Sequence, residues 1–367
     1  MTEWDAGVVK PVGTNVEPGD LEELGAALLR AAGMAASEAV AVAAMLVETS
    51  MHGTDSHGVM RLPVYARRCM AGGIVSPARI ERLRDDGGVV VLDGGAAAGH
   101  VVGARAVEEV TARASATGIA AVAVRNGNHL GALALYSRRI AERGQIGVVM
   151  TNASPRIAPT GGFEALLGNN PWTIGVPHPS GPLVMDVAQS IVAVGKIRMA
   201  KAAGEQLPTG WARDKHGAPT TDPDAALEGL VEPIGGHKGY GLVFMIDVLC
   251  AVLSGAASGP AVSGLFALDR PSGAGHLFMA LDIGHFTDPG AFAERLDLLV
   301  GLIRSSGRAP GVDVIHLPGD LERLTRERRL LEGIPLSAAV RADLAGITDE
   351  LGIDRPVWLA HDEPEEQ

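Results

Sequence analysis

The chain has 367 residues, of which 47% are hydrophobic and 48 are glycine, and its formal net charge is -12 at neutral pH. A chain of this length is expected to form two domains, each with its own core. The acidic balance and the absence of a lysine and arginine block argue against nucleic acid or an anionic membrane surface as a partner.

Cysteine content and hydropathy indicate a cytoplasmic protein. Two cysteines, Cys69 and Cys250, cannot build a disulfide framework, and their apolar helical surroundings predict buried free thiols. The first six residues lack the basic and apolar regions of a signal peptide. The longest apolar helix candidate, 242–253, is interrupted by Asp247 and falls short of the about 20 residues that span a bilayer, so a core helix is expected.

The amino-terminal 75 residues are predicted to be helical. The expected helices cover residues 21–32, residues 38–51, and a third segment that starts at 57 or 63 and ends at 71. Ser37 is placed to cap the second helix, and Gly72 follows the end of the third.

From residue 89 the pattern alternates between strand and helix. Strands are expected over 89–92, 119–124 and 146–150, with helices over 101–116 and 130–142 between them. The change of pattern places a domain boundary within residues 75–88. The tail after Pro318 returns to helix, and we expect it to fold back on the amino-terminal helices. Its arginines, including Arg329, alternate with glutamates and predict a solvated face.

The strand and helix rhythm does not indicate a dinucleotide-binding Rossmann unit. After Gly94 and Gly95 the next glycine is Gly99, so the Gly-x-Gly-x-x-Gly spacing is absent, and no acidic residue ends the following strand at Val124. A nicotinamide cofactor would therefore bind by another route.

The most informative histidine is His129, in the segment Asn126-Gly-Asn-His-Leu-Gly131 between a buried strand and a helix. Such a corner offers free backbone N–H groups and the positive end of a helix dipole, which favour an anionic substrate and a neutral imidazole.

A second constellation is Ser56-His57-Gly58 with Arg61 and Tyr65. If Ser56 caps a helix that begins at His57, then His57, Arg61 and Tyr65 share one face and suit a carboxylate substrate. Alternatively Pro63 begins the helix and His57 lies in the preceding loop. A helix cap with surface residues would explain the segment without any chemistry.

Two further segments carry polar residues in glycine-rich, apolar surroundings. One runs from Gly168-Asn-Asn-Pro171 through Asp186 to Gly195-Lys196, and the other is Gly235-Gly-His-Lys-Gly-Tyr-Gly241. The first could contact a ribose or pyrophosphate, although the backbone is the commoner partner for such residues. In the second, Lys238 could reach a phosphate at the start of a helix, and a flexible loop is an equally good account. The chain has no Gly-x-Ser-x-Gly elbow and no His-Glu-x-x-His or paired Cys-x-x-Cys, so no metal is expected.

Taken together, these ordered motifs resemble the malate/L-lactate dehydrogenase family that is unrelated to the Rossmann-type lactate and malate dehydrogenases. The resemblance extends from about residue 21 to 352 and includes Leu317-Pro-Gly-Asp320 and Gly333-Ile-Pro-Leu336. It implies a homodimeric α/β enzyme that uses NAD or NADP to interconvert a small 2-hydroxy acid and its 2-oxo acid. The implied architecture joins an orthogonal helical domain, residues 1–80 with 315–367, to an α/β sandwich that binds nicotinamide, residues 81–314.

The resemblance also implies roles for individual residues. His57 would be the proton donor with Ser56 beside it and His129 as the rival acid or base, and Arg61 with Tyr65 would bind the substrate carboxylate. The residues expected to line the cofactor are Asp186, Gln189, Ser190, Lys196, His237, Lys238, Gly319 and Asp320.

Two positions depart from the family pattern. Lys196 replaces the acidic relay residue of piperideine-2-carboxylate reductases, and the turn at residues 94–98 lacks its usual polar residues. Two alternative functions stay open: reduction of a cyclic 2-imino acid, and non-catalytic metabolite binding on the same fold.

Overall fold

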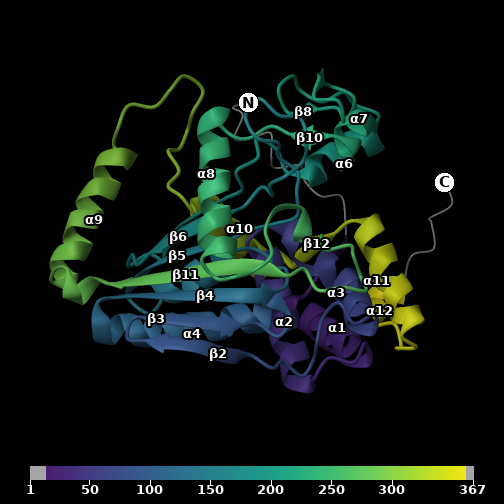
Figure 1. The fold of residues 1–367 in the computed structure, drawn as a ribbon, viewed down its shortest axis with the longest axis horizontal. Helices are drawn as coiled ribbons and strands as arrows, with labels where there is room; N and C mark the ends of the chain where they lie inside the picture. The colour runs from purple at the N-terminus through teal and green to yellow at the C-terminus, as the bar shows by residue number, and fades with distance from the viewer. Residues whose placement is uncertain (1–13, 361–367) are drawn as a thin grey trace.

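The protein is described here by a computed structural model that covers residues 14–360, drawn in Figure 1. The helices are α1 (Pro18–Ala31), α2 (Ala36–Met51), α3 (Leu62–Met70), α4 (Gly99–Thr117), α5 (Ala134–Ala141), α6 (Val194–Ala203), α7 (Pro223–Glu228), α8 (His237–Asp247), α9 (Pro289–Arg304), α10 (Asp320–Glu332), α11 (Ala338–Glu350) and α12 (Val357–Ala360). The strands are β1 (Thr14–Val16), β2 (Glu81–Asp86), β3 (Val89–Asp93), β4 (Ile119–Gly127), β5 (Gln145–Thr151), β6 (Trp172–Val176), β7 (Leu183–Val187), β8 (Ala212–Arg213), β9 (Pro219–Thr220), β10 (Leu230–Val231), β11 (Ala274–Asp282) and β12 (Ile334–Leu336).

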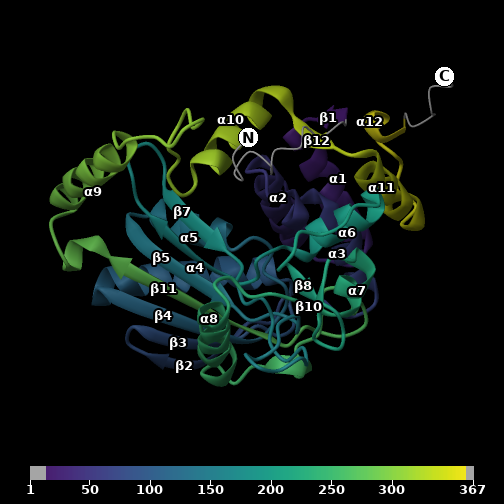
Figure 2. The ribbon, with the colours of Figure 1, turned by 90° about the horizontal axis from the view of Figure 1, so that it is seen from above.

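Helices from both ends of the chain share one hydrophobic core. Buried residues of α1, α2 and α3 pack in the same cluster as Ile334 and Leu336 of β12 and Leu344 and Ile347 of α11. β1 pairs with β12 in an antiparallel ladder. Figure 2 shows these segments gathered at one side of the molecule, so the tail folds back on the amino-terminal helices as the sequence predicts.

The central sheet has seven strands in the order β2-β3-β4-β11-β5-β6-β7. Its residues alternate between two covered faces, as the pleat of a strand requires. Val122 and Val124 pack in the cluster that contains Tyr136 of α5, whereas Ala123 packs with Ile246 and Cys250 on the other face. The sheet is therefore covered by α4 and α5 on one side and by α8 on the other.

The alternation of strands and helices in the sequence predicted only part of this sheet. Among the described strands only β3 and β4 pair in parallel, because β11 lies between β4 and β5 and is antiparallel to both. The strands β2, β6, β7 and β11 were not predicted. β2 is exposed along its whole length, so it carries no apolar alternation.

Two predicted helix starts are wrong. Ser37 does not cap α2, which begins at Ala36 and has no side-chain cap. The helix expected from residue 130 begins at Ala134, because Gly131 adopts a left-handed conformation with φ 76° that a helix cannot include.

The apolar segment 242–253 is not the core helix that its composition predicts. α8 continues into a π-helix, Val248–Val252, and the segment buries only one side against the sheet. The exposed fractions of Met245 and Val252 are 59% and 68%. α9 also presents exposed leucines, and Figure 1 shows it apart from the sheet. No helix within residues 14–360 is long and apolar enough to cross a membrane.

One buried arginine joins three parts of the fold. Arg68 of α3 is 1% exposed, and its guanidinium donates to Asn128 Oδ1 at 2.8 Å. It also donates to Ser272 Oγ and to the backbone carbonyls of Gly73, Gly264, Leu265, Ala267 and Arg270. Asn128 directly precedes His129, so this hub fixes the end of β4 and the loop 264–272 against α3.

The hub predicts a large stability effect. Arg68→Met should lower the free energy of unfolding by about 3 kcal/mol or more, because it leaves several buried acceptors without a donor. Urea denaturation measures this change. The matched control is Arg67→Met, which removes a surface ion pair with Glu350 and should cost no more than about 1 kcal/mol. Equal effects of the two variants would contradict a special role for Arg68.

Candidate active site

Two imidazoles from distant parts of the chain stack against each other. The ring centroids of His57 and His129 lie 5.5 Å apart, with 19° between the ring planes. His57 lies in a 3-10 turn, Asp55–His57, and Ser56 Oγ is 2.9 Å from its Nδ1. The structure thus brings Ser56, His57 and His129 together.

The local conformation around His57 differs from the single helix considered above. A second 3-10 turn, Val59–Arg61, follows Gly58, and α3 begins only at Leu62, next to Pro63. Gly58 is required because a Cβ there would lie 2.1 Å from Ser50 Oγ. Ser56 does not cap a helix, and the alternative in which Pro63 begins the helix is confirmed.

Tyr65 lies behind His129 and supports it. Its side chain is 0% exposed, and its hydroxyl is 2.7 Å from His129 Nδ1. The ring of His100 meets Tyr65 edge-on at 5.4 Å between centroids. In this structure the Tyr65 hydroxyl contacts His129, which fixes the orientation of that imidazole and leaves Nε2 as its free nitrogen.

The environment keeps these imidazoles neutral. Burial, and then the positive charge of Arg61, lowers the pKa of His57 to about 4. Burial also holds the pKa of His129 well below its usual value, and His57 adds to that effect. Both rings are therefore proton acceptors at neutral pH.

Arg61 is the cation beside His57. Its Nε donates to Ser56 O at 2.6 Å, its guanidinium lies over the ring of Phe266, and no carboxylate within residues 14–360 pairs with it. An anionic group next to His57 would find an available guanidinium here.

Arg329 holds the segment before His57. Its guanidinium donates to both carboxylate oxygens of Asp55, at 2.6 and 2.9 Å, and to Ser50 O. The predicted solvated face is therefore wrong for Arg329, which is buried. Alternating charge along α10 gave no sign of this contact, because Asp55 lies far away in sequence.

Asp186 occupies the beginning of α5, where the sequence suggested an anionic substrate. Its Oδ2 accepts from Ala134 N at 2.9 Å. Asp186 is exposed at the surface, but many protein atoms lie around its carboxyl. The partial loss of water raises the pKa of this carboxyl to about 6. The anion at this helix end is thus a side chain of the protein, and it binds the backbone five residues after His129.

Gln189 and Ser190 follow Asp186, and Ser190 pairs in an antiparallel bridge with Pro233, in the segment just before α8. Gln189 N donates to Asn169 O, and its carbonyl accepts from Ile234 N. The Gln189 side chain is buried, and its Oε1 has no hydrogen-bond partner among the described residues. Ser190 Oγ donates to Val192 O.

The remaining cofactor candidates lie around this strip. His237 and Lys238 form the exposed first turn of α8. Gly319 packs on β7, since Val184 N donates to Pro318 O. Asp320 is buried and accepts from Arg304 and from Leu317 N, whereas Lys196 lies exposed at the start of α6.

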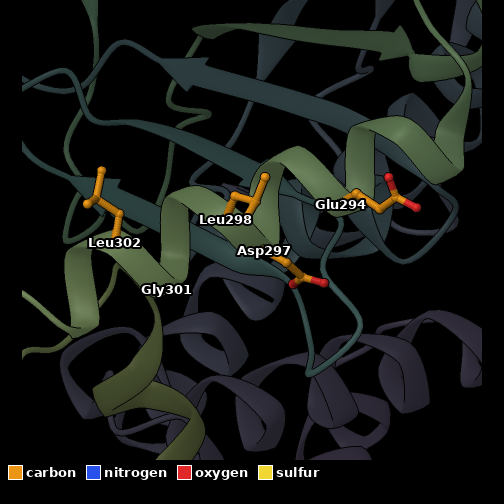
Figure 3. Close-up of a pocket in the computed structure, with 5 residues that line it drawn as sticks. All are labelled: Glu294, Asp297, Leu298, Gly301 and Leu302. Atoms are coloured by element: carbon orange, nitrogen blue, oxygen red, sulfur yellow. The ribbon is translucent and has the colours of Figure 1, made fainter.

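Two hollows on the surface do not include His57 or His129. One of about 610 Å³ lies along α9 and is lined by Glu294, Asp297, Leu298, Gly301 and Leu302 (Figure 3). It contains no histidine, cysteine or lysine. Within residues 14–360 no group of three or more histidine, cysteine or acidic side chains is arranged to hold a metal ion.

Comparison with known sequences identifies the family of this chain. Residues 16–345 match the family model described as malate/L-lactate dehydrogenase, and the chain belongs to that family. It is 37% identical over 324 residues to a malate dehydrogenase of Pyrococcus abyssi, covering 86% of this chain and 89% of that one. It is 38% identical over 313 residues to an L-sulfolactate dehydrogenase of Methanothermobacter thermautotrophicus, covering 85% and 90%.

Structural comparison gives the same family. The solved sulfolactate dehydrogenase from Methanocaldococcus jannaschii superposes with a TM-score of 0.87 at 33% identity, covering 93% of this chain and 98% of that chain. The predicted family and its enzyme class, a dehydrogenase, are thereby confirmed. The mixed α/β fold with a mostly antiparallel sheet also matches.

Two other relatives carry a coenzyme in their names. The (2R)-3-sulfolactate dehydrogenase (NADP(+)) of Chromohalobacter salexigens is 35% identical over 331 residues, covering 89% of this chain and 95% of that one. The ureidoglycolate dehydrogenase (NAD(+)) of Escherichia coli K12 is named for the other coenzyme and is 32% identical over 308 residues, covering 83% and 87%.

The buried histidines predict a loss of stability in acid. Burial lowers the pKa of His52 and His57 to about 4 and that of His100 and His276 to about 3. The unfolded chain therefore binds more protons than the folded chain below about pH 6.5, and the free energy of unfolding falls as pH decreases. The raised pKa of Asp186 offsets part of this effect.

The variant His100→Leu isolates one of these groups. Both ring nitrogens of His100 lack partners among the described residues, so an apolar side chain leaves no donor or acceptor unsatisfied. Urea denaturation between pH 7 and 5 should show a pH slope that is shallower by about one proton than in the wild type. Identical slopes would show that His100 does not contribute.

Proposed function

We propose that this chain is an NAD(P)-dependent dehydrogenase that interconverts a small 2-hydroxy acid and the corresponding 2-oxo acid. The observation that carries the proposal is the stacked pair His57 and His129, 5.5 Å apart and neutral, beside the guanidinium of Arg61, which pairs with no carboxylate within residues 14–360. A 2-hydroxy acid needs a base at its hydroxyl and a cation at its carboxylate, and these groups supply both.

The substrate class is supported by the relatives. The malate and sulfolactate dehydrogenases named above act on 2-hydroxy acids, and they match more than four fifths of this chain. A small carboxylate held by Arg61 would place its C2 hydroxyl near His57. In the oxidation direction, the neutral His57 Nε2 accepts the hydroxyl proton, while Ser56 holds Nδ1.

The protonation state in the reverse direction depends on the substrate. A carboxylate on Arg61 offsets the positive charge that lowers the pKa of His57, so binding favours the protonated ring. His57 would then donate that proton to the oxygen of the 2-oxo acid. His129 stays the rival donor, with Tyr65 holding its Nδ1.

The coenzyme proposal rests on polar groups along the strip 186–190. Gln189 Oε1 is a buried acceptor without a partner among the described residues, and it suits the amide N–H donor of a nicotinamide. Asp186, Ser190, His237, Lys238 and Gly319 would hold the rest of the coenzyme, with Lys196 and Asp320 at the edge. A bound nicotinamide coenzyme supplies the hydride acceptor.

We also propose the division into a helical unit, 1–80 with 315–367, and a coenzyme-binding unit, 81–314. Exposed apolar side chains on α8 and α9, such as Met245 and Leu298, support a homodimer in which a second copy covers them. Light scattering of the purified chain would measure its mass in solution. A cytoplasmic location without nucleic-acid or membrane partners stays a prediction from composition.

A coenzyme absorbance assay tests the function. The purified protein is mixed with NADH or NADPH and, in turn, with pyruvate, oxaloacetate, sulfopyruvate, oxalurate or a cyclic imino acid. We expect oxidation of one coenzyme with a 2-oxo acid of this set. Turnover of the cyclic imine alone would favour the imino acid alternative, and coenzyme binding without any turnover would favour a non-catalytic binding protein.

Variants of the histidine pair test the assignment of the acid and base. His57→Ala and His129→Ala should each lower turnover by about 100-fold or more, as loss of a general acid does. Steady-state kinetics with the best substrate of the panel measure the loss. Near wild-type turnover in one variant would remove that histidine from the mechanism.

A further inference from the structure

Two arginines from separate segments converge on one exposed aromatic ring. The guanidinium carbon of Arg61 lies 5.7 Å from the centroid of Phe266, and that of Arg198 lies 5.3 Å from it. Arg198 belongs to α6 (Val194–Ala203), and Arg61 immediately precedes α3. The loop that carries Phe266 therefore brings α6 and the His57 segment to a common point.

The position of this ring is fixed although its surface is open. Arg68 binds the carbonyls of Leu265 and Ala267, the residues on either side of Phe266. Leu265 and Leu268 pack against the helical core. The Phe266 side chain is nevertheless 58% exposed. The loop therefore holds an exposed aromatic ring in a fixed position.

The two guanidinium groups lack anionic partners among the residues that the structure describes. Neither Arg61 nor Arg198 forms an ion pair with a carboxylate within residues 14–360, whereas Lys201, also on α6, pairs with Asp224. Burial lowers the pKa of Arg61, and the charge of Arg198 contributes to that decrease. The arrangement concentrates positive charge that an anion would offset.

We propose that Arg198 binds a second anionic group of the substrate, beyond the carboxylate held by Arg61, and so determines a preference for dianionic 2-oxo acids. This inference rests on the proposed function, because it takes Arg61 as the carboxylate site. Both guanidinium carbons lie within 6 Å of the centroid of Phe266, at 5.7 Å for Arg61 and 5.3 Å for Arg198, so a substrate carboxylate on Arg61 would have the second cation close to it.

The test compares two substrates that differ by one carboxylate, oxaloacetate and pyruvate. Arg198→Met keeps an unbranched, shorter side chain and removes its charge. We expect kcat/KM for oxaloacetate to fall by about 10- to 100-fold, the effect of losing a charge-assisted hydrogen bond. The value for pyruvate should change by less than about 3-fold, and the KM for the coenzyme should not change.

Two further variants serve as controls. Lys201→Met removes a positive charge from the same helix and should leave the preference for oxaloacetate as it is. Arg61→Lys should lower kcat/KM for both substrates, because each carries the first carboxylate. An equal loss on both substrates in Arg198→Met, no loss on either, or a raised KM for the coenzyme would overturn the proposal.

A binding measurement separates this inference from the proposed function. If the wild type turns over no 2-oxo acid, the proposed function fails, and calorimetry with L-malate and L-lactate then decides the role of Arg198. We expect the wild type to bind L-malate more tightly than L-lactate and Arg198→Met to lose that difference. Equal affinity of the wild type for the two acids would overturn the proposal.

Discussion

The buried guanidinium of Arg68 is the constraint on which the site depends. Removing a charge from water is costly unless hydrogen bonds replace the water, and here backbone carbonyls and Asn128 do so. The acceptors come from the ends of three segments, so the charge is satisfied only when all three are assembled. The same residues adjoin His129 on one side and Phe266 on the other.

Burial away from water determines the protonation state of the two imidazoles. His57 and His129 stack in a setting where burial and neighbouring positive charge both oppose protonation. Tyr65 and Ser56 each occupy an Nδ1 atom, which leaves the Nε2 atoms to face a ligand. Under the proposed function, a substrate carboxylate on Arg61 would offset this positive charge and favour the protonated ring of His57.

The motifs around the candidate site could be recognised from the sequence because they combine less common residue types with glycine at fixed spacing. Ser56-His57-Gly58 is an example: Gly58 passes so close to Ser50 that no side chain fits. The helical ends and the three strands near residues 90, 120 and 147 followed from apolar periodicity. β2 and the 3-10 turns around His57 were missed, since exposed strands and short turns have no such period.

The amino-acid sequence by itself determined the family, the candidate histidines and Arg61, and the helical character of both chain ends, because these depend on local residue types and their order. Tertiary structure alone decided that β11 separates β4 from β5, that Arg329 binds Asp55, and that Arg61 and Arg198 meet at Phe266. Such contacts join residues distant in sequence. Local pattern does not encode them, because they arise only when packing brings the segments together.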